Sequence, residues 1–271
     1  MGNTPATRPV HSQLDDTGLA EFLSGLTAVS RPIIRDWFRR GSTVEWKPDA
    51  SPVTRADKAT ETALRAAIEA RFPDDAILGE EHAARPGTGK TDYAWVIDPI
   101  DGTRAFVSGR PVFGTLVGLV QGNRPVAGLI DIPMQDECYV AVGGQTFLNG
   151  VPVTTSAVTS LAQSRIATTA PEALLSDSLA AFNQMVAKAP ITTYGGDCYN
   201  YALLAAGHLD LVLEDGLATH DIMGVVEVVR SAGGLVTDKN GEDVTLDGTH
   251  SLLAAATPAL HAEALAIIRA S

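Results

Sequence analysis

The sequence predicts a mixed α/β fold of the α+β type, in two halves that differ in their pattern of elements. Across residues 1–150, two long segments with apolar side chains at helical spacing precede short apolar runs separated by turn signals. This pattern is typical of helices packed over a mostly antiparallel sheet. Across residues 151–271, strand-like and helix-like segments alternate, which indicates an α/β arrangement. The 271 residues, 45% of them hydrophobic, suffice for one large domain or two closely packed halves.

The elements follow from start and stop signals along the chain. Residues 1–13 are expected to form a loose polar tail, and residues 83–92 a mobile loop. Thr54 is a suitable N-cap for the second helix. The helices are expected at about 15–40, 54–72, 177–188, 198–207, 220–232 and 258–269. The strands are expected at 44–46, 76–79, 95–97, 113–121, 124–132, 137–142, 165–168, 191–194, 209–213, 234–236 and 252–255, with a tight hairpin at Gly122-Asn123.

The composition excludes several classes of protein. The formal net charge is −12 and the sequence pI about 4.8, without a basic stripe, which argues against nucleic-acid binding. Only Cys138 and Cys198 are present, too few for a disulfide framework, and we expect both to be reduced and structural. No signal peptide or membrane-spanning stretch is visible, so we expect a cytoplasmic protein without a membrane partner.

The stretch Trp95–Thr103 reads as a short buried strand that runs into a carboxylate-rich turn. Pro99 cannot continue a strand ladder, so Asp98 is expected at the strand end and Asp101 in the turn. At 4 Å two carboxylates repel each other by about 4 kcal/mol at an effective dielectric constant of 20, and a cation reverses that cost. The backbone amides that follow, from Gly102 on, could hold a phosphate. Ordinary turn chemistry explains the same residues when they are taken alone.

Further acids at the ends of elements favour the metal interpretation. The four are Asp57, Glu80, Glu81 and Asp221. Each has a structural explanation by itself, either as a charge at a helix N-terminus or as a solvated loop residue. Together with the acids of the turn, they form the oxygen-rich donor set that Mg²⁺ requires. His82 and His220 are isolated, and we expect them to be surface or supporting groups rather than ligands.

Several motifs resemble the inositol monophosphatase family of Mg²⁺-dependent, Li⁺-sensitive phosphatases. They span most of the chain in the family's order: Ser51-Pro52-Val53-Thr54 through Asp57, Gly79-Glu80-Glu81, Trp95–Thr103, and Asp221 before Ala232-Gly233-Gly234. The resemblance implies a layered αβαβα sandwich and a homodimer that acts on a small phosphate ester. The halves 1–150 and 151–271 would then supply most of the metal ligands and the substrate side, respectively.

The resemblance also implies roles for individual residues. Two or three Mg²⁺ ions would be held by Glu80, Asp98, Asp101, Asp221 and the carbonyl of Ile100. Asp57 and Thr103 would position the attacking water, with Glu80 counted beside them among the catalytic residues, and the amides of Gly102 and Thr103 would bind phosphate. The implied reaction is direct hydrolysis by a metal-activated water, without a phosphoenzyme.

The segment after the turn points to a subgroup. Arg104–Leu116 and Gly195–Tyr199 resemble the histidinol-phosphate phosphatases, enzymes of histidine biosynthesis, more than the inositol-type members. Asp197 and Glu214, with Arg104, are the candidate substrate-binding residues, and the two carboxylates suit a cationic leaving group. Asp197 could instead cap the helix that follows it. His220 stands where the family usually carries Trp or Tyr, which affects the shape of the pocket.

Two alternatives remain at this point. The same chemistry could act on inositol monophosphate, a nucleotide 3′-phosphate or a sugar phosphate. A non-catalytic protein that binds a metabolite or a partner protein is the alternative from another class, and the retained acids and Thr103 argue against it.

Overall fold

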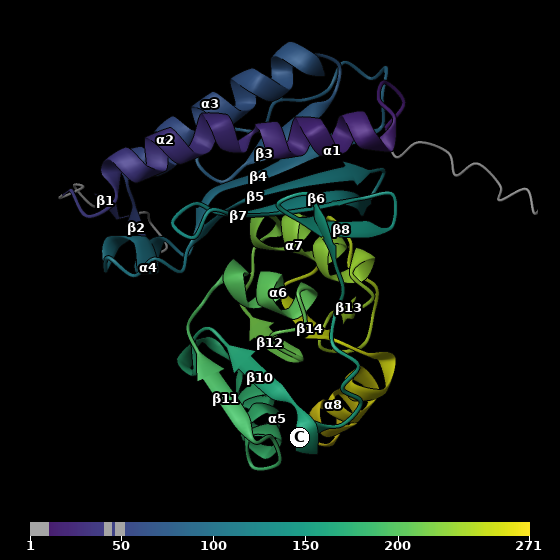
Figure 1. Ribbon diagram of the computed structural model, residues 1–271. Coiled ribbons are helices and arrows are strands. Elements are labelled where there is room, and N and C mark those ends of the chain that lie inside the picture. The colour runs from purple at the N-terminus through teal and green to yellow at the C-terminus, as the bar shows by residue number, and fades with distance from the viewer. Residues whose placement is uncertain (1–10, 41–44, 47–51) are drawn as a thin grey trace, which may run out of the picture.

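The computed structural model of the chain describes residues 11–40, 45–46 and 52–271 (Figure 1). The helices are α1 (Asp16–Gly25), α2 (Thr27–Trp37), α3 (Arg55–Arg71), α4 (Thr103–Val107), α5 (Ser176–Val186), α6 (Cys198–Ala205), α7 (Thr219–Ser231) and α8 (Pro258–Ala270). The strands are β1 (Glu45–Trp46), β2 (Pro52–Val53), β3 (Ala76–Gly79), β4 (Tyr93–Asp101), β5 (Gly114–Gln121), β6 (Arg124–Ile132), β7 (Glu137–Val142), β8 (Gln145–Leu148), β9 (Val151–Val153), β10 (Arg165–Thr168), β11 (Ile191–Tyr194), β12 (Leu211–Asp215), β13 (Leu235–Thr237) and β14 (Ser251–Ala255).

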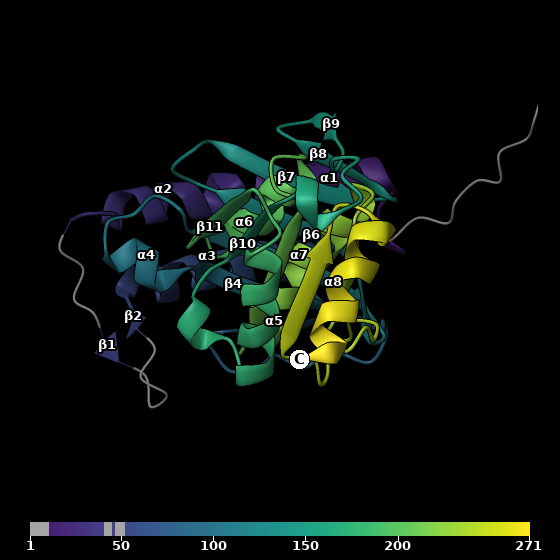
Figure 2. The same ribbon diagram turned by 90° about the horizontal axis from the view of Figure 1, so that it is seen from below.

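Helices and sheets alternate in layers, as Figure 1 shows. Helices α1, α2 and α3 cover one face of a seven-stranded sheet of order β3-β4-β5-β6-β7-β8-β9, in which only the β3–β4 pair is parallel. Helices α6 and α7 lie between this sheet and a mixed five-stranded sheet of order β11-β10-β12-β14-β13. Helices α5 and α8 lie side by side on the outer face of the second sheet (Figure 2). The predicted layered αβαβα sandwich is confirmed.

Several predicted boundaries were wrong. The expected helix 15–40 is divided into α1 and α2. The division falls at Leu26, directly after Gly25, and glycine is a poor helix former. Helix α2 ends at Trp37, and Gly41, where the end was expected, lies outside the described residues. The first sheet also contains the hairpin β8–β9, so it extends just past residue 150. That hairpin was missed because β8 and β9 have only four and three residues.

Strand β4 does not end at Asp98, as the sequence suggested. Asp98 pairs with Leu116 and Asp101 pairs with Gly114, and the register shifts between the two pairs. Pro99 lies within this irregular segment, where its missing N–H costs no ladder hydrogen bond. The two aspartates therefore lie within the last residues of β4 rather than in a turn beyond it.

The alternation of side chains along β4 explains which layer each residue faces. Trp95 and Ile97 pack in the core beneath α1 and α3, whereas Val96 packs in the core that contains α7. Side chains of a strand alternate between its two faces. Asp98 follows Ile97 and therefore faces the same layer as Val96, toward α7.

Glycines allow α7 to approach the first sheet closely. A Cβ atom on Gly118 of β5 would lie 2.6 Å from the backbone carbonyl of Met223 in α7. A Cβ on Gly128 of β6 would collide with the carbonyl oxygen of Gly224 in the same helix. The sheet and the helix are thus in backbone contact, and this contact fixes the position of the N-terminal turn of α7 relative to β4.

We expect the substitution Gly118→Ala to lower the free energy of unfolding by about 1–3 kcal/mol, because α7 must move away from the sheet. The midpoint of urea denaturation measures this change. Gly25→Ala is the matched control, since a Cβ there meets no atom within 4 Å, and its stability should be unchanged or slightly higher. Equal midpoints for the two variants would contradict the close contact of α7.

Candidate active site

Four acids predicted as metal ligands converge where β3, β4 and α7 meet. Glu80 follows the last residue of β3, Asp98 and Asp101 belong to β4, and Asp221 lies in the first turn of α7. Asp98, Asp101 and Asp221 each offer an oxygen within 4.8 Å of the others'. Glu80 and His220 form a second such set with Asp98. Asp98, which is 2% exposed, is common to both sets.

The electrostatics of this carboxylate cluster suit a cation. Burial raises the pKa of Asp98 well above its usual range, and the nearby charges of Glu80, Asp101 and Asp221 raise it further. Burial also raises the pKa of Asp101, followed by the charges of Asp197 and Asp221. Carboxylates packed this way are unfavourable without a compensating positive charge. A donor set made mostly of carboxylate oxygens fits Mg²⁺ or a similar divalent ion.

Asp57, in the first turn of α3, both caps that helix and lies near Thr103. Its buried carboxylate accepts hydrogen bonds from the backbone N–H of Thr54 at 2.9 Å and from the Thr54 hydroxyl, so it completes a capping box. The hydroxyl oxygen of Thr103 lies 3.4 Å from the carboxylate of Asp57 and 3.1 Å from the carbonyl oxygen of Ile100. Asp57, Thr103 and Ile100 therefore lie together, beside the acids of β4.

The turn before α4 has a backbone conformation that requires glycine. Gly102 has φ +84°, a left-handed conformation that side chains disfavour, and it caps the short helix α4. A Cβ atom at this position would lie 2.9 Å from the carboxylate of Asp197. The turn thus depends on glycine for its dihedral angles and for the close approach of a neighbouring carboxylate.

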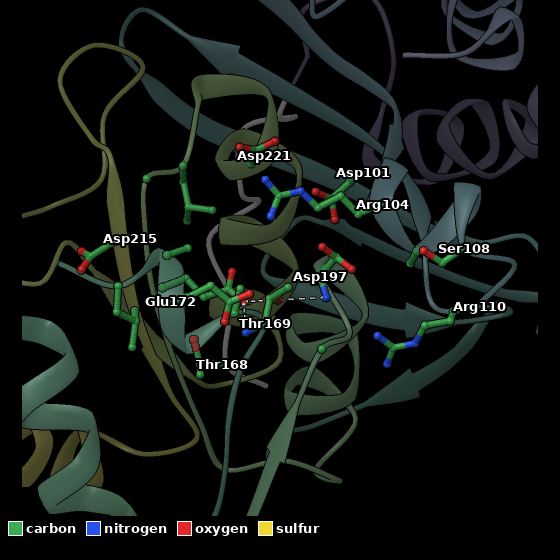
Figure 3. A pocket seen from close by; sticks show the side chains of 18 residues that line it. Asp101, Arg104, Ser108, Arg110, Thr168, Thr169, Glu172, Asp197, Asp215 and Asp221 are labelled. Carbon is green, nitrogen blue, oxygen red and sulfur yellow. Dashed lines mark hydrogen bonds between the residues drawn. The ribbon is translucent and has the colours of Figure 1, made fainter. Parts of the chain in front are cut away.

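A cavity of about 450 Å³ opens beside the carboxylate cluster. Figure 3 shows Asp101, Arg104 and Asp221 at one end and Thr168 and Glu172 at the other. The cavity is lined by Asp101, Arg104, Ala105, Ser108, Arg110, Thr168, Thr169, Ala170, Glu172, Ala173, Leu174, Gly195, Asp197, Glu214, Asp215, Gly216, Leu217 and Asp221. It therefore joins the cluster on the first sheet to residues at the end of the second sheet.

Asp197 lies in this cavity and does not act as a cap. It precedes α6 but makes no side-chain hydrogen bond to the first turn of that helix. The backbone N–H of Cys198 instead donates to the carboxylate of Asp101 at 2.6 Å. Burial raises the pKa of Asp197 to about 6, although Arg110 and Arg104 oppose the shift. The capping interpretation of Asp197 is therefore wrong.

Glu214 is held by a hydrogen-bond network at the cavity wall. Tyr201 donates its phenolic O–H to one carboxylate oxygen at 2.9 Å, and Thr169 donates its backbone N–H to the other at 3.1 Å. The Thr169 hydroxyl also hydrogen-bonds to this carboxylate and accepts from the backbone N–H of Asp197 at 3.0 Å. Burial raises the pKa of Glu214 to about 7. Asp197 and Glu214 are thus joined through Thr169.

Sequence reasoning missed a residue that positions Glu80. Glu61, inside α3, is fully buried and accepts hydrogen bonds from the backbone N–H of Glu81 at 2.6 Å and of His82 at 3.2 Å. Arg65 neutralises it at 2.7 Å. A Cβ on Gly79 would collide with the Glu61 carboxylate. Glu61 therefore anchors the turn that carries Glu80, and the glycine in Gly79-Glu80-Glu81 was the available signal.

Other neighbours of the site had no signal in the sequence. Arg110 and Glu172 line the cavity, and Glu172 follows β10 by only a few residues. The 83–92 segment, expected to be a mobile loop, contains no helix, and Arg85 forms an isolated bridge with Ile77. None of the described helices is long and apolar enough to cross a membrane.

The fold and the site together define a layered α/β protein with a buried acidic cluster beside an open cavity, a setting suited to metal-assisted phosphoryl transfer. The family model described as "Inositol monophosphatase family" matches residues 15–271. The chain therefore belongs to the inositol monophosphatase family, and it is a phosphatase.

Curated relatives carry more than one substrate name. The bifunctional phosphatase IMPL2, chloroplastic, of Arabidopsis thaliana is 39% identical over 90% of this chain and 71% of its own length. A histidinol-phosphatase of Chlorobaculum parvum is 36% identical over 79% of this chain and 83% of its own. Among solved structures, an inositol monophosphatase from Zymomonas mobilis has a TM-score of 0.83 and 37% identity, covering 93% of this chain and 98% of that one.

We expect Glu61→Gln to weaken the site although Glu61 does not face the cavity. The substitution replaces one acceptor oxygen by a donor that faces an N–H group, which costs about 1–3 kcal/mol. The thermal midpoint should fall, and the Mg²⁺ concentration for half-maximal phosphate release should rise, because Glu80 is no longer held.

The matched control is Glu69→Gln on the same helix. The Glu69 carboxylate is 44% exposed and lies 3.6 Å from Arg85, an exposed pair of little energetic value. Glu69→Gln should change neither the thermal midpoint nor the Mg²⁺ concentration for half-maximal phosphate release. A Glu61→Gln enzyme with the Mg²⁺ requirement of Glu69→Gln would contradict the positioning role.

Proposed function

We propose that this phosphatase is a Mg²⁺-dependent phosphomonoester hydrolase whose physiological substrate is histidinol phosphate. The observation that carries the metal-dependent part is the carboxylate cluster of Asp98, Asp101 and Asp221 beside the Gly102 turn and the cavity. A volume of about 450 Å³ is suited to a small ester.

The proposed ligands of two or three Mg²⁺ ions are Glu80, Asp98, Asp101, Asp221 and the carbonyl oxygen of Ile100. When bound, Mg²⁺ supplies charge neutralisation for the phosphoryl group and an acidified water. The Thr103 hydroxyl and the Asp57 carboxylate lie 3.4 Å apart, so one water beside the pair could contact both oxygens and give its proton to Asp57. Such a pair allows direct hydrolysis without a phosphoenzyme.

The phosphate is proposed to bind at the amides of Gly102 and Thr103, at the N-terminus of α4. The alcohol part then extends into the cavity, toward Asp197, Glu214 and Arg104. Arg104 is exposed and offers N–H donors to an oxygen of the substrate. Glu172 adds a further carboxylate to this side of the cavity.

The charge of the cavity favours a cationic alcohol. Histidinol carries an ammonium group and an imidazole, whereas inositol carries only hydroxyl groups. Asp197 and Glu214 both line the cavity, and Asp197, with a pKa of about 6, supplies the negative charge proposed to face the leaving group. The relatives named histidinol-phosphatase support this choice, and those named inositol monophosphatase make inositol phosphate the second candidate. A homodimer, a cytoplasmic location and a role in histidine biosynthesis remain predictions.

A phosphate-release panel tests the proposal. We expect histidinol phosphate to have the highest kcat/KM, inositol monophosphate, a nucleotide 3′-phosphate and a sugar phosphate to be poorer, and chelation of Mg²⁺ to abolish turnover. Asp197→Ala should lower kcat/KM for histidinol phosphate on the order of tenfold, the value of one lost charge interaction in a partly buried site, and change inositol phosphate hydrolysis less.

Asp177→Ala is the control, because Asp177 lies on α5 and pairs with Lys239 at 2.8 Å, outside the cavity lining. The Asp177→Ala enzyme should prefer histidinol phosphate over inositol phosphate as strongly as the unmodified chain does. An Asp197→Ala enzyme with full preference for histidinol phosphate would refute the recognition role. Absence of Mg²⁺-stimulated turnover on every ester would refute the hydrolase proposal and favour a non-catalytic binding protein.

A further inference from the structure

His220 lies inside the acidic site rather than on the surface around it. Its Nε2 atom is 3.6 Å from the carboxylate of Asp221 and 3.9 Å from that of Glu80. Its side chain is 26% exposed, and it occupies the first turn of α7, directly before Asp221. The ring therefore points a nitrogen at the same space as the two carboxylates.

The separations are too long for direct hydrogen bonds. A hydrogen bond between such atoms requires about 2.7–3.2 Å, so neither carboxylate is bonded to the His220 ring. Among the described residues, the ring has no other hydrogen-bond partner either. A histidine that served only in a surface ion pair, or only as a packed aromatic ring, would not need its nitrogen directed at two carboxylates. The nitrogen instead lies near both carboxylates without being hydrogen-bonded to either.

The spacing of these atoms can be compared with that of the ligands around a metal ion. Ligand atoms about 2.1 Å from an octahedral ion are about 3 Å apart when adjacent and about 4 Å apart when opposite. One ligand atom each from Glu80, Asp98 and His220 lies within 4.8 Å of the other two. Asp98 connects this group to the Asp101–Asp221 set.

We propose that His220 is a metal ligand, and that its imidazole nitrogen biases one of the ions of the site toward Mn²⁺ or a similar transition metal. Mg²⁺ prefers oxygen ligands, whereas imidazole suits first-row transition metals. The Asp98–Asp101–Asp221 set remains all-oxygen and suited to Mg²⁺. The inference rests on the metal site of the proposed function and adds a nitrogen donor to it.

The test is pulsed electron paramagnetic resonance of the full chain loaded with Mn²⁺, together with Mn²⁺ and Mg²⁺ titrations by calorimetry. The unmodified chain should show modulation from a directly bound histidine nitrogen. His220→Tyr, which keeps a ring at this position, should lose that modulation. Its ratio of Mn²⁺ to Mg²⁺ affinity should fall on the order of tenfold.

His208→Gln is the matched control, because His208 is exposed in the turn after α6 and outside the acidic cluster. It should keep the nitrogen modulation and the affinity ratio. Circular dichroism establishes that His220→Tyr is folded, and His220→Gln provides a second variant with the same expected loss. Bound Mn²⁺ without histidine modulation in the unmodified chain would overturn this inference alone. Failure of the unmodified chain to bind either ion would overturn the metal site and the proposed function together.

Discussion

Asp98, Asp101 and Asp221 lie close together in a buried site, where ionised carboxylates repel one another. At an effective dielectric constant of 20, two charges 4 Å apart repel by about 4 kcal/mol, and Asp98 faces several such neighbours. The backbone contact between α7 and the first sheet holds Asp221, in the first turn of α7, close to the acids of β4. A bound cation reverses the sign of these interactions. In the proposed function, metal binding therefore relieves the repulsion among these acids.

The two sheets carry different groups of site residues. The first sheet carries Asp98 and Asp101 on β4, and Glu61 anchors the turn after β3. The second sheet carries Glu214 on β12, and the network through Thr169 extends from it to Asp197. On this account the metal side sets the reaction and the second sheet sets the substrate. The cavity lies between the two groups of residues and is lined by both.

The sequence predicted most of the layers and the convergent acids, because each acid stands at the end of an element with its own cap or turn signal. It could not predict Glu61, whose burial depends on contact with Gly79, eighteen residues away. It also placed Pro99 beyond a strand end, although a register shift accommodates it within β4. The roles of the acids depend on the metal and remain predictions. The division of the chain into two halves at residue 150 also remains a prediction.

The most direct test of the central claim is phosphate release by Asp98→Asn over a full range of Mg²⁺ concentrations. Asp98 is shared by both donor sets, so neutralising it removes charge from every proposed metal position. We predict that turnover falls on the order of a hundredfold or more and is not restored by saturating Mg²⁺, while the thermal stability without metal is maintained or rises as repulsion is relieved. Full activity of Asp98→Asn at saturating Mg²⁺ would contradict the account.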